Sequence, residues 1–183
     1  NTTNYFTITT NPLLAQISTF NNLKTISYAA TLSNNSSLTK IEGFDSLQTV
    51  AASFKIEDNN SLTALNDFNQ LQYVGGDFFI NDNNSLTTIS GFDSLKIVNN
   101  RNYNDFQIYN NDNLTDITGF QTLETLLGSF SITNNDVLQN INAFQKLSTT
   151  NYFTITTNPL LAQISTFNNL KTISYAATLS NNS

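Results

Sequence analysis

The chain has 183 residues, of which 39% are hydrophobic and 11% are charged, and its net charge at pH 7 is −6. Few charged residues and a negative net charge argue against nucleic-acid binding. No run of apolar residues reaches the roughly 18 residues that a membrane-spanning helix needs. Because His and Cys are absent, the usual general base and the thiol nucleophile are excluded. Catalysis would have to rest on carboxylates alone, so we expect no enzyme activity and no cofactor.

A short sequence period begins near the first residue and runs through the whole chain. One aliphatic position recurs with sequence offsets of 24, 24, 24, 28, 24, 23 and 24, at Ile8, Leu32, Ile56, Ile80, Ile108, Ile132, Ile155 and Leu179. After it, each coil places apolar residues at every third position, among them a Phe at the twelfth. These side chains cannot be buried within one unit, so the period predicts a solenoid in which each coil covers the next.

Each coil is predicted to contain one strand and one structural asparagine. Phe or Ala two residues before the aliphatic position gives the alternation of a strand, and Asn follows three residues after that position. The Asn amide can donate to and accept from neighbouring coils, which predicts a ladder of Asn11, Asn35, Asn59, Asn83, Asn111, Asn135 and Asn158. We expect little α-helix, although Asp45 and Asp93 could each cap a single helical turn.

The sequence also contains a longer repeat, because residues 2–36 reappear unchanged as residues 149–183. Identity over 35 residues indicates tandem duplication, since solenoid coils tolerate wide surface variation. We therefore expect one continuous solenoid over 1–183, with a 147-residue unit (2–148) of six coils and a second copy that starts at 149 and is cut at 183. The sequence is then a window onto a longer array. Six coils at about 4.8 Å each would advance about 29 Å.

The coils resemble those of receptor L domains, a branch of leucine-rich-repeat-like right-handed solenoids. The likeness covers the whole chain and is closest at SLTTISGFDSLKIV (85–98) and NLTDITGFQTLETLLGSFSITNN (113–135). It implies an all-β-dominated fold, a right-handed parallel β-helix with about 24 residues per coil. Asn-rich, Cys-free chains with near-identical long units look most like large secreted surface proteins and adhesins of Bacteroidota. The resemblance therefore implies an extracellular or cell-surface location.

Candidate binding residues lie on the outward face of the predicted strands. Phe79 and Tyr109 are large aromatics at positions that should face solvent, with Gln107 beside them, and they could stack on a sugar or a protein partner. Residues 99–105 hold a four-residue insertion that should project and bring Arg101 and Tyr103 to the same face. The alternative is that these aromatics are ordinary exposed residues and that the insertion is neutral.

Two other kinds of site are suggested by the turns. Asp58 and Asp82 occupy the same place in adjacent coils, where they could hold Ca²⁺ or, less readily, form an acid/base pair. The alternative is that both are solvated turn acids. The Asp-Ser-Leu triplets at Ser46 and Ser94 resemble the O-glycosylation signal of Bacteroidota, against which chance occurrence must be weighed.

Our leading hypothesis is a non-enzymatic structural segment of an extracellular surface filament, stalk or giant adhesin. Its partners would be further repeat units, through stacking or bundling, together with glycans or surface proteins bound weakly at many lateral sites. The alternative is a discrete receptor-type module that binds one glycan or protein. A weaker alternative is an ice-binding solenoid, suggested by Thr7/Thr9 and Thr154/Thr156 but interrupted by residues such as Lys55.

Overall fold

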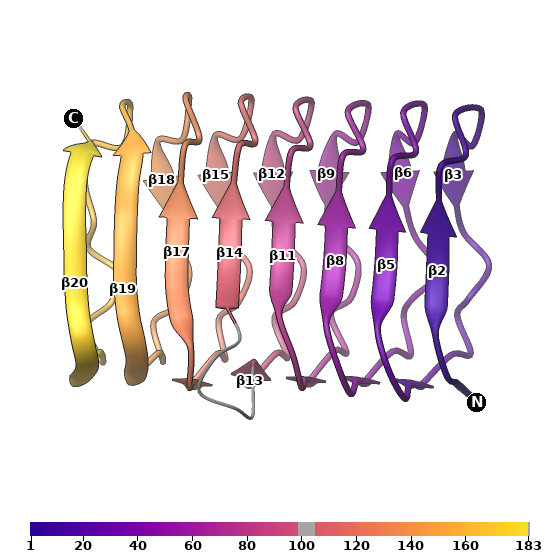
Figure 1. The fold of residues 1–183 in the computed structure, drawn as a ribbon, viewed down its shortest axis with the longest axis horizontal. Helices are drawn as coiled ribbons and strands as arrows, with labels where there is room; N and C mark the ends of the chain where they lie inside the picture. The colour runs from indigo at the N-terminus through magenta and orange to yellow at the C-terminus, as the bar shows by residue number, and fades with distance from the viewer. Residues whose placement is uncertain (99–104, 183) are drawn as a thin grey trace.

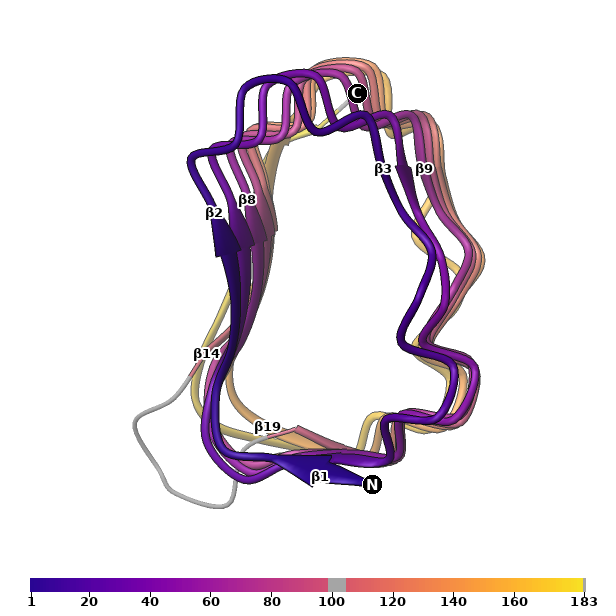
Figure 2. The same ribbon diagram turned by 90° about the vertical axis from the view of Figure 1, so that its right-hand side faces the viewer.

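The structure is a computed structural model that describes residues 1–98 and 105–182. These residues form a parallel β-solenoid of about seven turns with about 24 residues per turn (Figure 1, Figure 2). They contain no helix, and none of them belongs to a segment that could cross a membrane as a helix. The predicted parallel β-solenoid and the predicted length of its coils are therefore confirmed.

The front wall of the solenoid is a ladder of parallel strands, one from each coil (Figure 1). Facing residues are one coil apart and in register, so Ile56 of one strand lies opposite Ile80 of the next. The strands are β2 (Phe6–Thr9), β5 (Ala30–Ser33), β8 (Phe54–Glu57), β11 (Phe78–Asn81), β14 (Asp105–Tyr109), β17 (Ser129–Thr133), β19 (Thr149–Asn158) and β20 (Thr172–Asn182). Their apolar side chains alternate inward, as the Phe-x-Ile pattern predicts.

Two further walls are built from strands of only two residues. One comprises β1 (Thr2–Thr3), β4 (Thr25–Ile26), β7 (Thr49–Val50), β10 (Tyr73–Val74), β13 (Ile97–Val98) and β16 (Thr125–Leu126). The other comprises β3 (Gln16–Ile17), β6 (Lys40–Ile41), β9 (Ala64–Leu65), β12 (Thr88–Ile89), β15 (Asp116–Ile117) and β18 (Asn140–Ile141). The first of these walls joins the front wall through β19, which turns the corner between them and pairs with both β16 and β17.

Two columns of phenylalanines fill the core. Within each column the rings stack from coil to coil, as in Phe78–Phe106 at 5.0 Å and Phe92–Phe120 at 5.1 Å between centroids. Between the columns they meet edge to face, as in Phe78–Phe92 at 5.1 Å. All four rings are completely buried. Both geometries are the favoured ones for aromatic pairs, so the columns add directional packing to ordinary apolar burial.

The Gly-Phe-Asp-Ser-Leu segments form tight turns. The Leu47 N–H donates to the Phe44 carbonyl at 3.0 Å, and Leu95 does the same to Phe92. The single helical turns expected at Asp45 and Asp93 are therefore wrong, because each turn closes after four residues and the chain at once extends again.

The second copy of the long repeat stacks directly on the first. Phe130 of β17 pairs with Phe153 of β19, and Thr125 of β16 pairs with Thr149. The offset between paired residues changes from 24 at Thr149 to 23 at Tyr152, so this coil is one residue shorter at its corner. There the Thr150 side chain is fully buried and donates to the Gly128 carbonyl at 3.0 Å. The sheet thus crosses the boundary between copies without a break.

Candidate functional site

The predicted asparagines form a continuous hydrogen-bonded row along one corner of the solenoid. Asn83 is typical: its backbone N–H donates to Asn111 Oδ1 at 3.2 Å, and its Nδ2 donates to the carbonyls of Ile56 and Asn81 at 3.0 and 2.9 Å. The same pattern links Asn11, Asn35, Asn59, Asn83, Asn111, Asn135 and Asn158, and Asn182 extends it. Since these amides saturate backbone groups that no strand pairs, their role is structural.

The residue before each asparagine of the row has a left-handed backbone. Asp58 and Asp82 have φ angles of 56° and 57°, and Asn110 and Asn134 have 52° and 54°. Asn and Asp tolerate this conformation better than other side chains with a Cβ. The paired Asp-Asn and Asn-Asn dipeptides of the sequence are thus explained by backbone geometry, and Asp58 and Asp82 fill turn positions.

The structure brings Phe79, Gln107 and Tyr109 together on two adjacent strands of the front wall. Phe79 lies opposite Gln107, and all three side chains are partly exposed. The Lys55 Nζ stands 4.7 Å from the centroid of the Phe79 ring. This cation–π contact occupies one side of the ring that was expected to stack on a ligand. Arg101 and Tyr103, the other two predicted binding residues, lie outside the described residues.

A buried asparagine, Asn81, connects the C-terminal ends of β8, β11 and β14. Asn81 is only 3% exposed, and its Nδ2 donates to Glu57 Oε1 at 3.0 Å and to Tyr109 Oη at 3.1 Å. Its Oδ1 is buried and has no hydrogen-bond partner among the described residues. Strand alternation alone would place Asn81 and Ser33 in solvent, and that expectation is wrong, because both side chains are buried on the outward face.

The hydroxyl of Tyr109 sits in an acidic environment. Burial raises the pKa of Tyr109 above its ordinary value, and the negative charges of Asp82, Glu57 and Asp58 raise it further. The phenol therefore stays protonated in the physiological range. Because its oxygen accepts from Asn81, its O–H remains a donor beside several carboxylate acceptors. The patch formed by Lys55, Glu57, Phe79, Gln107 and Tyr109, called the central face below, thus combines aromatic rings with donors and acceptors.

Carboxylates join the N-terminal ends of the same three strands. Ser53 Oγ donates to Asp77 Oδ2 at 3.2 Å, and the Asp105 N–H donates to Asp77 Oδ1 at 3.1 Å. Gln107 Nε2 donates to Asp105 Oδ2 at 3.1 Å. These bonds fix the Gln107 side chain in place, so the predicted binding residue is held by its own strand.

The structure gives no support for calcium at Asp58 and Asp82. Among residues 1–98 and 105–182, no cluster of three or more acidic side chains is arranged to hold a metal ion. Ser46 and Ser94, the predicted O-glycosylation residues, lie in the tight turns and are partly exposed, next to the exposed Asp45 and Asp93.

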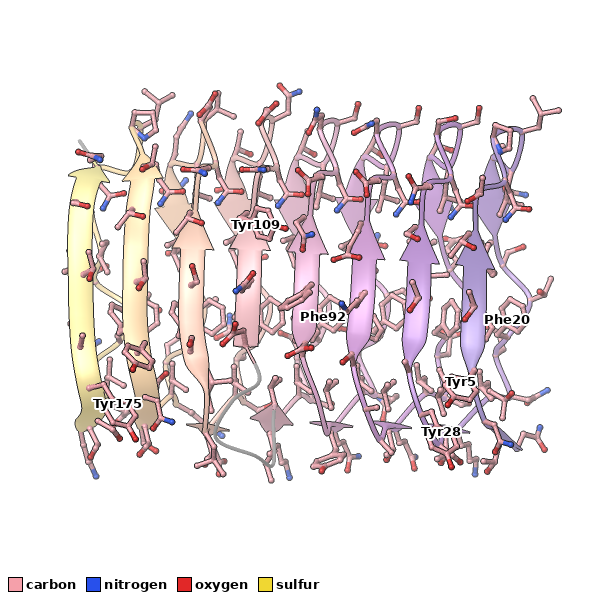
Figure 3. All side chains as sticks on the ribbon, in the orientation of Figure 1. Tyr5, Phe20, Tyr28, Phe92, Tyr109 and Tyr175 are labelled. Carbon is pink, nitrogen blue, oxygen red and sulfur yellow. The ribbon has the colours of Figure 1, made fainter. Side chains whose placement is uncertain are left out.

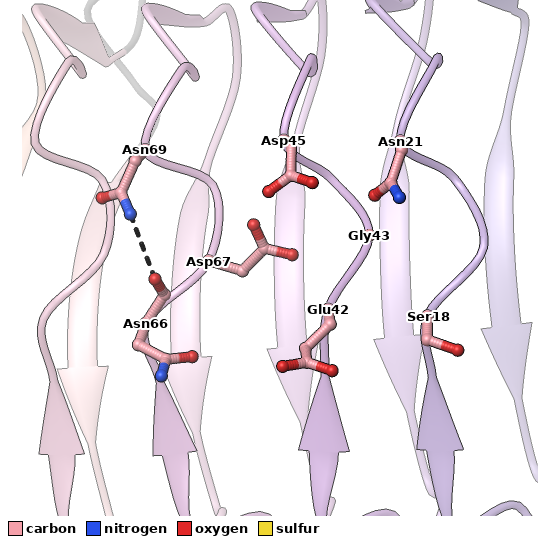
Figure 4. A pocket seen from close by; sticks show the side chains of 8 residues that line it. All are labelled: Ser18, Asn21, Glu42, Gly43, Asp45, Asn66, Asp67 and Asn69. Carbon is pink, nitrogen blue, oxygen red and sulfur yellow. Dashed lines mark hydrogen bonds between the residues drawn. The ribbon is translucent and has the colours of Figure 1, made fainter.

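A polar groove of about 350 Å³ lies over the first three coils (Figure 4). Its lining consists of Ser18, Asn21, Glu42, Gly43, Asp45, Asn66, Asp67 and Asn69. Asp67 is buried, and its carboxylate accepts the Phe44 N–H at 3.0 Å and the Phe68 N–H at 2.8 Å. Its carboxylate bridges two coils whose backbones differ, since Gly43 has a positive φ in one and Phe68 in the other. The Asp67 carboxylate therefore has a structural role, because it holds the backbones of two adjacent coils together.

Two stacked tyrosine pairs stand on the surface, and sequence reasoning missed both. Tyr5 and Tyr28 have centroids 4.7 Å apart, and Tyr152 and Tyr175 are 5.0 Å apart. All four are strongly exposed; Figure 3 labels three of them. The period of the apolar positions hides each pair because its members are one residue closer together than that period. The pair Tyr152–Tyr175 stands where the strand register changes, since Thr150 pairs with Ile173 but Tyr152 pairs with Ala176. Their recurrence in the exact repeat was the available signal.

Comparison with known proteins finds no matching family model, no matching curated protein and no matching solved structure. The resemblance to receptor L domains thus has no support beyond the coil pattern itself, and the fold stands as a parallel β-solenoid.

Proposed function

We propose that the chain is a non-enzymatic repeat segment of an extracellular surface filament, stalk or giant adhesin. The observation that carries the proposal is the junction: a second, identical copy of residues 2–36 stacks on the preceding coil with the sheet unbroken. Adding further units in this way lengthens the rod without changing its cross-section. Leucine-rich-repeat-like surface proteins of the Bacteroidota type, which the coils resemble, would use such a rod outside the cell.

The exact repetition supplies a mechanism for adhesion. Whatever a unit presents on its lateral surface recurs once per long repeat, which is about 29 Å for six coils at about 4.8 Å per coil. The exposed tyrosine pairs illustrate this, because Tyr5–Tyr28 and Tyr152–Tyr175 are the same pair in successive copies. Weak binding of glycans or surface proteins at each site would then be multiplied by multivalency.

Electron microscopy of the native material that bears this sequence tests the proposal. Long uniform fibres with an axial repeat of about 29 Å are the expected result. Isolated short particles would contradict the filament and leave a separate module.

A discrete receptor-type module is the second candidate, and the central face favours it. Lys55, Phe79, Gln107 and Tyr109 meet on three adjacent strands and occur once in the described residues, so they could make a single glycan or protein site. A module of this kind binds one equivalent of ligand per chain and loses binding in Tyr109→Ala. A glycan array run with the natural chain and with Tyr109→Ala, using Tyr73→Ala as the control, separates the two candidates.

A further inference from the structure

The outward side chains of the front wall change character along the rod. Strands β8, β11 and β14 carry the central face, in which Figure 3 labels Tyr109. The charged residues of the described front-wall strands, Lys55, Glu57 and Asp105, all lie on these three strands. The matching outward positions of β2, β5 and β17 carry only hydroxyls. These positions, called the hydroxyl face below, are Thr7, Thr9, Thr31, Ser33, Ser131 and Thr133, with the repeated residues Thr154, Thr156, Thr178 and Ser180.

The two faces alternate with the period of the long repeat. The unit 2–148 contributes six strands to the front wall, three with the central face and three with the hydroxyl face. Ser131 of β17 pairs with Thr154 of β19, so the hydroxyl face continues across the boundary between copies. In an array of such units, each face therefore occupies about 14 Å of the unit length of about 29 Å, at about 4.8 Å per strand.

The two faces also differ in the size of their side chains. Phe79 carries the Lys55 Nζ 4.7 Å from its ring centroid, and Gln107 is held by its bond to Asp105. These side chains are longer than Ser and Thr and project further from the sheet. Two front walls brought together in phase would meet at Phe79 and leave gaps over their hydroxyl faces. A shift of three coils instead places the long side chains over hydroxyl faces, so the sheets can approach to the roughly 10 Å that is usual for packed sheets.

The charges favour the same shift. The chain carries a net charge of −6, and contact in phase would bring Glu57 and Asp105 of one rod toward the same residues of the other. The shifted contact places these carboxylates against uncharged hydroxyls, which avoids like-charge repulsion. A hydroxyl can donate to Glu57 or to Gln107 Oε1 and can accept from Lys55 or Tyr109. The hydroxyl face therefore suits every polar side chain of the central face.

We propose that the front walls of two rods pack face to face with a shift of three coils, so that the central face of each rod lies on the hydroxyl face of the other. This inference rests on the proposed filament and names its lateral partner, a second copy of the same rod. Phe79 then lies over Thr154 or Thr156 whichever way the partner rod runs, because β11 and β19 are the middle strands of the two faces.

The area of this contact predicts how strongly the rods pair. A contact about four residues wide and about six strands long measures about 13 by 29 Å, which is roughly 400 Å² on each rod. The total of roughly 800 Å² per unit lies below the about 1,200 Å² at which stable interfaces begin. One unit therefore pairs weakly, and many units in register pair firmly through multivalency.

Paramagnetic relaxation between molecules tests the pairing with the chain itself, since this measurement detects weak association. Because the chain has no Cys, a nitroxide attaches only to an introduced thiol. Thr157→Cys places the label on an exposed residue beside the hydroxyl face and leaves that face unchanged. The labelled chain is mixed at millimolar concentration with ¹⁵N-labelled natural chain. The expected result is amide broadening that is strongest in β11.

A label on another wall provides the control. Thr88 of β12 is partly exposed, and a label at Thr88→Cys should broaden β11 no more than the other strands. Broadening from Thr157→Cys that is strongest in β19 would mean that the walls meet in phase. That result, equal broadening of all walls, or no broadening would overturn the proposal.

A pair of charges tests which residues meet. Thr154→Glu, added to the labelled chain, places a carboxylate where the central face of the partner would lie and should reduce the broadening of β11 several-fold. Thr88→Glu adds the same charge to another wall and should leave the broadening unchanged. Mixing the Thr154→Glu chain with ¹⁵N-labelled Phe79→Lys should restore the broadening, because opposite charges then meet. An equal loss with Thr88→Glu, or no recovery with Phe79→Lys, would contradict the pairing.

Electron microscopy of native fibres separates this inference from the proposed filament. The expected result is paired fibres displaced along their axis by half a unit, about 14 Å. Long fibres that stay single, or that pair in phase, would overturn the pairing while the filament stands. Isolated short particles would contradict the filament on which the pairing rests.

Discussion

The side-chain oxygen of Asn111 accepts two hydrogen bonds from Asn83, one from the backbone N–H at 3.2 Å and one from Nδ2 at 3.4 Å. Both side chains are fully buried. One amide therefore serves two coils at once, and the same relationship recurs along the whole row. Loss of one member leaves donors and acceptors unpaired in both neighbouring coils.

We predict that Asn83→Ala lowers the free energy of unfolding by about 2–5 kcal/mol, since several buried polar groups lose their partner at about 1–3 kcal/mol each. The exposed neighbour Asn84 provides the control, and Asn84→Ala should change stability by no more than about 0.5 kcal/mol. Urea denaturation followed by circular dichroism measures both. Similar losses in the two variants would show that the row is not a principal source of stability.

Asp67 should matter for stability although it lines a groove. Its two oxygens accept the N–H groups of Phe44 and Phe68, so Asp67→Ala should cost about 1–3 kcal/mol and Asp67→Asn less, because the amide keeps one acceptor. Asp93→Asn, on an exposed turn, should be close to neutral. Thermal unfolding of the three variants checks the order, and a neutral Asp67→Ala would contradict it.

Stability at high pH should depend on Tyr109. Because the pKa of Tyr109 is raised above its ordinary value of 10.0, the phenol ionises in the unfolded chain before it does so in the folded chain. Its contribution is complete below about pH 10 and is lost as the pH rises through the folded pKa. Urea midpoints from about pH 9 to about pH 11 should therefore fall more in the natural chain than in Tyr109→Phe. Parallel curves would argue against the raised pKa.

The fold could be predicted because its determinants repeat. The apolar spacing, the phenylalanine columns and the asparagine row each depend on one residue type at one place in the coil, so a single chain shows each of them about seven times. Stacking follows because no coil can bury these residues alone. The helical turns considered possible at Asp45 and Asp93 do not form, because the preference of Asp for a helix cap is local and the chain returns to an extended strand directly after each turn.

The surface was harder to predict because its contacts join different coils. Asn81 is buried by Glu57 and Tyr109, its neighbours one coil away on either side, and alternation along a single strand cannot reveal that cover. Lys55 reaches Phe79 in the same way. The tyrosine pair Tyr152–Tyr175 stands at a one-residue register shift, which changes the alignment between coils without changing the apolar pattern.

The unbroken stacking of the second copy on the first is tested most directly by ¹⁵N relaxation of backbone amides in β17 and β19. One rotational diffusion tensor should describe Ser129–Thr133 and Thr149–Asn158 together, because the strands are paired in register. Two independent tensors, with fast motion at the 147–150 boundary, would mean that the copies are separate blocks and would contradict a continuous rod.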